Sequence, residues 1–144
     1  MTACVVPDNS SMSIAAAPEL NASQLIELGR QAASAPACPQ CGALVCPGWE
    51  SMPGSFERER LRRVGTLRRE AQEEPTLREH HPLGTHVWSA DAPIAPAYFP
   101  YNRCDVWQCK SCPRAYLRYT EYGGYYEDER IRAVDPELID DTPG

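Results

Sequence analysis

Two short cysteine clusters carry the residue types in this chain that are best suited to chemistry. The first is CPQCGALVC at residues 38–46, and the second is CDVWQCKSC at residues 104–112. The C-x2-C-x4-C spacing of the first cluster runs in reverse in the second. Because two C-x2-C pairs can surround one ion with four thiolates, this spacing predicts a shared tetrahedral metal site. Its expected ligands are Cys38, Cys41, Cys109 and Cys112.

The two pairs resemble the knuckles of zinc-ribbon and rubredoxin-like proteins, which typically read C-P-x-C-G and lead into a strand. The first pair, C-P-Q-C-G, matches fully, and Gly42 would let backbone amides approach sulfur. The second pair, C-K-S-C-P, has Lys110 where proline is common and Pro113 where glycine is common. The resemblance implies one closed Zn²⁺ site per chain, although iron would fit the same four sulfurs.

Cys46 and Cys104 are the outer members of the two clusters. If the C-x2-C pairs meet, these two thiols lie on adjoining segments, and we expect them to approach each other as a buried pair. A redox-linked disulfide is one alternative, and a second metal site with nearby histidines is another. The histidines fall within HHPLGTH and are His80, His81 and His86. A two-iron cluster on residues 104, 109 and 112 would need a fourth cysteine, and none follows Cys112.

The composition narrows the function classes. Twenty acidic against fourteen basic residues give a net charge of −6, which disfavours a phosphate backbone as partner. No apolar run approaches the roughly 18 residues of a membrane span, and the N-terminal segment lacks the pattern of a signal peptide. We therefore expect a cytoplasmic protein with no membrane partner. The common hydrolase, nucleotide-binding and metalloprotease motifs are absent from the sequence, so we assign no catalytic residues.

Three segments between and around the clusters have distinct patterns. Residues 19–34 show helical periodicity, with Asn21 and Gln24 spaced as a capping pair. Residues 56–81 hold seven arginines interleaved with six glutamates, which indicates an ion-paired, solvated surface rather than a nucleic-acid site. Four prolines between residues 82 and 100 predict an ordered loop whose aromatic side chains cover the core.

Residues 115–134 read as a β-hairpin, because two strand-like runs flank Gly-Gly. A two-residue turn would set three cross-strand pairs, which are Tyr122 with Tyr125, Arg118 with Glu129, and Tyr116 with Ile131. The opposite face, where Leu117 would lie opposite Arg130, is expected to be the wetter one. Four hairpin tyrosines could form a contact surface, with burial in the core as the alternative; they are Tyr119, Tyr122, Tyr125 and Tyr126.

Together these patterns predict a small α+β fold with a zinc-ribbon-like β core, a C-terminal hairpin, one N-terminal helix and long proline-rich loops. The expected organisation has three parts: a tail at 1–18, one metal-stabilised domain at 19–136 and an acidic tail at 137–144. Within the domain, an insertion at 47–103 separates knuckles at 38–46 and 104–114. The predicted function is a non-enzymatic, zinc-stabilised module that binds another protein. The alternatives are a rubredoxin-like or thiol-based redox protein and a nucleic-acid-binding ribbon.

Overall fold

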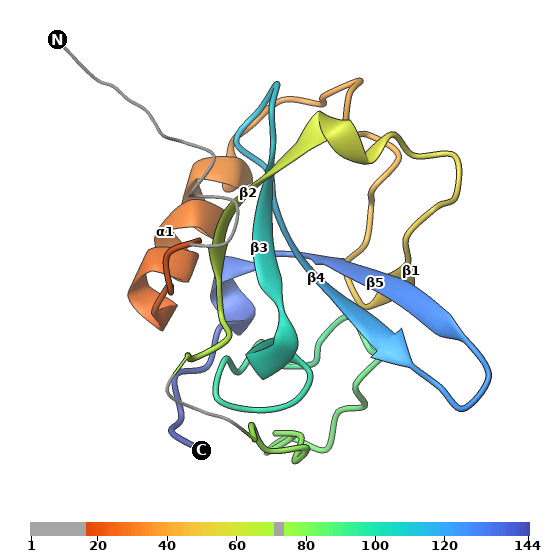
Figure 1. Ribbon diagram of the computed structural model, residues 1–144. Coiled ribbons are helices and arrows are strands. Elements are labelled where there is room, and N and C mark those ends of the chain that lie inside the picture. The colour runs from red at the N-terminus through yellow and green to blue at the C-terminus, as the bar shows by residue number, and fades with distance from the viewer. Residues whose placement is uncertain (1–16, 71–73) are drawn as a thin grey trace, which may run out of the picture.

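The computed structural model describes residues 17–70 and 74–144. Its one α-helix in that range is α1 (Ala22–Ala33), and short 3-10 turns occur at η3 (Arg58–Arg60), η4 (Tyr101–Arg103) and η5 (Pro136–Leu138). The strands are β1 (Glu50–Ser51), β2 (Leu61–Thr66), β3 (Asp105–Cys109), β4 (Ala115–Tyr122) and β5 (Glu127–Ala133). They form a single antiparallel sheet of order β1-β5-β4-β3-β2 (Figure 1). One helix and this sheet make an α+β fold, as predicted.

The sheet is covered on both faces, because successive side chains of a strand point to opposite sides. On one face, Val106 and Leu117 pack with Leu25 of α1 and with the loop that precedes β3. On the other face, Tyr116 and Ile131 pack with the segment that follows α1. Both cysteine clusters contribute to these cores, so the fold positions them directly.

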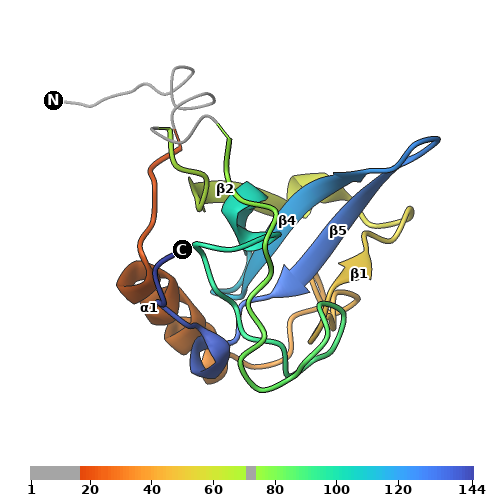
Figure 2. The ribbon, with the colours of Figure 1, turned by 90° about the horizontal axis from the view of Figure 1, so that it is seen from below.

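The capping pair predicted at the start of α1 is present. The Asn21 side chain accepts a hydrogen bond from the Gln24 N–H at 2.8 Å, and the Gln24 side chain accepts one from the Asn21 N–H at 2.8 Å. On the helix face that meets η5, Gly29 lies so close to Pro136 that an added Cβ would stand 2.8 Å from the proline ring. Helix and turn therefore lie side by side (Figure 2).

The β4–β5 hairpin forms, but its predicted register is wrong by two residues. Tyr122 lies opposite Glu127 rather than Tyr125, because the connection spans residues 123–126. The Gly123 N–H donates to the Tyr126 carbonyl at 2.8 Å inside this loop. A shift of two keeps every side chain on its face of the sheet, and Arg118 still reaches the Glu129 carboxylate at 2.6 Å.

The hairpin face expected to be wet is buried. Leu117 is fully buried and Tyr119 nearly so, with the Tyr119 ring edge-on to Trp49 at 4.9 Å between centroids. Leu117 lies opposite Arg132, and this arginine is itself 0% exposed. Its guanidinium donates to acceptors from three segments, which are the carbonyls of Pro47, Ala90 and Ala92 and the hydroxyl of Tyr101. Hydrogen bonds from every nitrogen of the guanidinium make this burial of a charge tolerable.

The arginine-rich segment contains strand β2, which its polar composition concealed. Leu61 at the start of β2 is buried, and the strand pairs with β3. The predicted ion pairing is present, but most of the acidic partners come from outside the segment. Arg60 pairs with Glu57 inside the segment. The other four ion pairs have a carboxylate from outside it, and they are Arg58–Glu129, Arg63–Asp105, Arg68–Asp105 and Arg69–Glu19.

The C-terminal residues expected to form a separate acidic tail contact the fold. Ile139 bridges Ile94, and the Asp140 carboxylate lies 2.9 Å from His80 Nε2. The Tyr98 hydroxyl donates to the Pro143 carbonyl at 3.0 Å. Of the segment expected to be an N-terminal tail, residues 1–16 lie outside the described residues. Across residues 17–70 and 74–144, no helix has the length and apolar composition to cross a membrane.

Candidate metal centre

The second knuckle is the turn of the β3–β4 hairpin. Strand β3 ends at Cys109, β4 begins at Ala115, and Gln108 is the last β3 residue to pair with it. The Cys109 N–H donates to the Arg114 carbonyl at 2.9 Å, which closes the turn. Cys109 and Cys112 are thus held at one end of the sheet.

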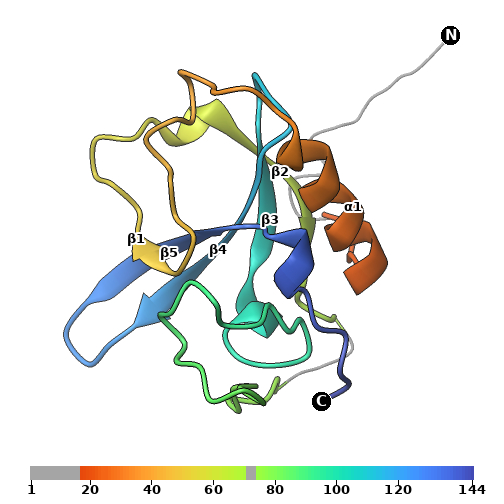
Figure 3. The same cartoon turned by 180° about the vertical axis from the view of Figure 1, so that it is seen from behind.

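The first knuckle lies in the turns that follow α1. The Leu44 N–H donates to the Cys41 carbonyl at 2.9 Å, and Leu44 itself is buried in the sheet core. At Gly42, a Cβ would stand 2.8 Å from the Cys38 carbonyl oxygen, which is closer than such atoms pack. The glycine therefore fits because the chain folds back tightly on Cys38. In Figures 1 and 3 this segment lies beside the β3–β4 turn.

Four sulfur atoms meet where the knuckles touch. The ligand atoms of Cys38, Cys41, Cys109 and Cys112 all lie within 4.8 Å of one another. The Cys38 and Cys109 sulfurs are 3.9 Å apart, and those of Cys41 and Cys112 are 3.5 Å apart. Zn–S bonds of about 2.3 Å in a tetrahedron place sulfurs about 3.8 Å apart. All four are free thiols, so the cluster could hold a metal ion.

Two donors near the sulfurs brace the site. The Ser111 N–H donates to Cys109 Sγ at 3.4 Å, and Arg114 Nη1 lies 3.8 Å from Cys112 Sγ. The Arg114 guanidinium also donates to the carbonyls of Pro36 and Ala35 at 2.8 and 3.2 Å. This arginine therefore ties the second knuckle to the chain leading into the first. Sequence reasoning missed it, although a basic residue two positions after a ligand cysteine was a usable signal.

The thiols of the cluster differ in acidity. The backbone amides of Cys41 and Gln40 lower the pKa of the Cys38 thiol to about 7. Burial raises the pKa of Cys41 to about 12, and burial also raises the pKa of Cys109. The hydroxyl of Tyr116 is buried beside Cys41, and burial raises its pKa as well. A bound cation would supply the positive charge that four thiolates need in this setting, since metal ligation requires deprotonated sulfur.

Cys46 and Cys104 are not brought together. Cys46 packs in the core that contains the four clustered thiols, whereas Cys104 packs in the core on the opposite face of the sheet. Burial raises the pKa of both thiols, that of Cys46 to about 12. The Cys104 thiol donates to the Pro100 carbonyl at 3.3 Å. Strand β3 separates Cys104 from Cys109, the nearest cysteine of the four-sulfur group. The mirrored spacing of the two clusters therefore does not bring Cys46 and Cys104 together.

The three histidines contact nearby polar groups instead of the cysteines. His80 Nε2 faces Asp140, and its ring stacks on Tyr98 at 4.7 Å between centroids. The two ring nitrogens of His81 lie 2.7 Å from Thr85 Oγ1 and 2.7 Å from Glu79 Oε1. Within the described ranges, the four-cysteine group is the one set of three or more His, Cys, Asp or Glu side chains close enough to share an ion.

The tyrosines considered as a contact surface divide into two groups. Tyr119 is buried, whereas Tyr122, Tyr125 and Tyr126 are 73%, 103% and 55% exposed around the β4–β5 turn.

Comparison of the chain with models of known protein families, with curated proteins and with solved structures finds no match.

Proposed function

We propose that this chain is a non-enzymatic binding domain, stabilised by one structural Zn²⁺ ion, that acts by contacting another protein. The observation that carries the proposal is the group of four free thiols whose sulfurs lie within 4.8 Å. Four thiolates complete the coordination of zinc and leave no position for an activated water, which is the usual mark of a structural site. The zinc-ribbon resemblance is supported by the second knuckle, which turns between two antiparallel strands.

A structural ion would stabilise the irregular segment that carries the first knuckle. The first knuckle belongs to residues 34–49, which contain no helix or strand and connect α1 to the two-residue strand β1. An ion shared with Cys109 and Cys112 would fasten that irregular segment to the end of the central β3–β4 hairpin. Zinc would thereby replace contacts that a larger apolar core would otherwise provide.

A protein partner is favoured by the surface. Three exposed tyrosines, Tyr122, Tyr125 and Tyr126, project around the β4–β5 turn, and tyrosine is enriched in protein interfaces. A nucleic-acid partner is disfavoured by the net charge of −6 and by the carboxylate partners of Arg58, Arg63 and Arg68. We place the protein in the cytoplasm, where clustered C-x2-C pairs more often bind metal than form disulfides.

Elemental analysis of the purified full chain tests the metal proposal. We expect one zinc per chain in the wild type and in Cys46→Ala, a control that removes a neighbouring buried thiol outside the four-sulfur group. Cys41→Ala should contain no stoichiometric metal. A visibly coloured protein with one iron per chain would instead favour the rubredoxin-like alternative. A folded wild-type protein that contains neither metal contradicts the proposal.

A further inference from the structure

Strand β4 is longer than the strand beside it. Pairing between β3 and β4 begins at Asp105, opposite Arg118, whereas β4 continues to Tyr122. Before Asp105 the chain turns away as η4. The last four residues of β4 remain paired with β5 on their other side. In the part of the chain that the structure describes, no strand pairs with this end of β4 on its β3 side.

The hydrogen-bonding pattern shows which backbone groups lie at this open edge. In antiparallel strands, successive residues direct their N–H and C=O groups to alternate sides. The Val134 N–H donates to the Ala115 carbonyl, so the backbone groups of odd-numbered β4 residues point toward β5. The Cys109 N–H donates to the Arg114 carbonyl, so the backbone groups of even-numbered residues point toward β3. Thr120 and Tyr122 therefore direct two donors and two acceptors toward the space where β3 has ended.

A cleft of about 540 Å³ lies along this edge. It is lined by β4 residues 118–122 and by aromatic and basic side chains from neighbouring segments, including Phe99, Arg103 and Trp107. Its volume is within the roughly 300–1,000 Å³ typical of ligand sites. Trp107 and Phe99 each lie under a guanidinium, that of Arg118 at 4.2 Å and that of Arg103 at 5.7 Å from the ring centroid.

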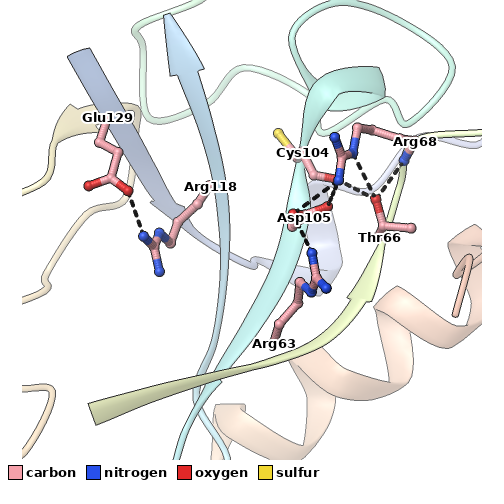
Figure 4. A network of polar contacts seen from close by, with 7 residues as sticks. All are labelled: Arg63, Thr66, Arg68, Cys104, Asp105, Arg118 and Glu129. Atoms are coloured by element: carbon pink, nitrogen blue, oxygen red, sulfur yellow. Dashed lines mark hydrogen bonds and ion pairs between the residues drawn. The ribbon is translucent and has the colours of Figure 1, made fainter. Parts of the chain in front are cut away.

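The lining of the cleft carries three arginines, Arg68, Arg103 and Arg118, and an equal number of carboxylates. Three carboxylates line it, and each is already paired with arginine: Asp105 with Arg63 and Arg68, Glu121 with Arg130, and Glu129 with Arg58 and Arg118. Figure 4 shows Asp105 with Arg63 and Arg68, and Glu129 with Arg118. Arg103 is a further cation, and among the described residues no carboxylate forms an ion pair with it.

Two buried guanidinium nitrogens in this cleft have no hydrogen-bond partner in the described chain. They are Arg103 Nε and Arg118 Nη1. The Arg118 side chain is only 10% exposed, and Arg103 donates from Nη2 to the Pro75 carbonyl at 3.1 Å. Among the described residues, the Pro75 carbonyl is the one hydrogen-bond acceptor of the Arg103 side chain. This half-buried guanidinium therefore has further N–H groups to offer an acceptor from outside. A carboxylate is the acceptor that also balances the charge of Arg103.

We propose that this cleft binds an extended acidic peptide as an added strand on the edge of β4. The peptide backbone would pair with Thr120 and Tyr122, and one of its carboxylates would pair with Arg103. The inference rests on the proposed function as a protein-binding domain and names the chemistry of the partner. A strand edge recognises a peptide main chain, which distinguishes this partner from a nucleic acid or a free anion.

The test is a selection of random twelve-residue displayed peptides against the zinc-loaded full chain, followed by synthesis of the enriched sequences. We expect an Asp or Glu at a fixed position. Arg103→Gln should weaken binding about tenfold or more, since a hydrogen bond between charged groups contributes about 1.5–3 kcal/mol. Arg30→Gln, which changes an exposed arginine on α1, should leave the affinity unchanged. Methylation of peptide amides should abolish binding at alternate positions only.

Thr120→Pro tests the backbone contact separately. Proline removes an N–H that points to the open edge, so it blocks an added strand without breaking a β4–β5 hydrogen bond. We expect loss of peptide binding with an unchanged circular dichroism spectrum. Peptides without an acidic preference, or binding that persists in both variants, overturn the inference. So does binding of phosphate or of a single-stranded oligonucleotide at this cleft when no peptide is selected. The zinc content of the same samples tests the proposed metal role independently.

Discussion

The sulfurs of Cys41 and Cys112 lie 3.5 Å apart although 71 positions separate the residues in the chain. The intervening chain forms strands β1, β2 and β3, so the knuckles meet only when the sheet is assembled. The entropy cost of closing a loop rises only slowly with its length, so one metal site can join two knuckles this far apart in the chain. Metal binding at these sulfurs would therefore be coupled to completion of the sheet.

The two halves of CDVWQCKSC should respond differently to substitution. Cys112→Ser should lose the metal and lower thermal stability strongly, because it removes one of four ligands. Cys104→Ser should retain one metal per chain and lose about 1 kcal/mol, since a hydroxyl can keep the bond to the Pro100 carbonyl. Elemental analysis and thermal unfolding of both variants check this. Equal metal loss in the two variants would contradict the assignment of ligands.

The tight fold of the first knuckle should be sensitive to one methyl group. Gly42→Ala places a Cβ 2.8 Å from the Cys38 carbonyl oxygen, and the backbone must shift to accommodate it. We expect a cost of about 1–3 kcal/mol, as for other overpacked sites, measured as easier zinc transfer to a chromogenic chelator. Gly54→Ala is the matched control, because no atom lies within 4 Å of its added Cβ. Similar transfer from both variants would show that the knuckle is not constrained.

Arg132 should be the most costly arginine of strand β5 to replace. Arg132→Met leaves a set of buried acceptors without donors, and we expect a loss of about 3–5 kcal/mol in the free energy of unfolding. Arg130→Met on the same face should lose at most about 1 kcal/mol, because that side chain is 19% exposed and forms ion pairs. Urea denaturation measures both. A smaller loss for Arg132→Met than for Arg130→Met would refute the buried network.

The capping box of α1 gives a prediction independent of the metal. Asn21→Ala removes the acceptor for the Gln24 N–H and should cost about 1 kcal/mol. Zinc content should not change. A stability equal to that of the wild type, measured by urea denaturation of zinc-loaded protein, would show that packing alone fixes the start of the helix.

The local features of the fold could be predicted from the sequence. The start of α1, the two knuckles and the existence of the β4–β5 hairpin each depend on a few neighbouring residues, such as Asn21 with Gln24. The hairpin register could not be fixed in this way. Gly123 and Gly124 fit a two-residue turn, but the observed register puts Arg132 opposite Leu117, where its guanidinium reaches acceptors from distant segments.

The features that were missed depend on contacts across the fold. Strand β2 was hidden because Arg62 and Arg63 obscure its apolar alternation, and its partner strand is about forty residues away. The predicted approach of Cys46 and Cys104 assumed that symmetry in the sequence gives proximity in space. Cys46 lies in the irregular segment after α1 and Cys104 directly before β3, and the two side chains enter different cores. The cleft beside β4 arises from unequal strand lengths, which no local pattern specifies.

Removal and return of zinc tests the central claim most directly. The wild-type protein is treated with a chelator under reducing conditions while its far-UV circular dichroism and thermal unfolding are recorded. We predict loss of β-sheet signal and a lower melting temperature, both restored by one equivalent of Zn²⁺ per chain. An unchanged spectrum and unchanged thermal stability after complete metal removal would contradict the account.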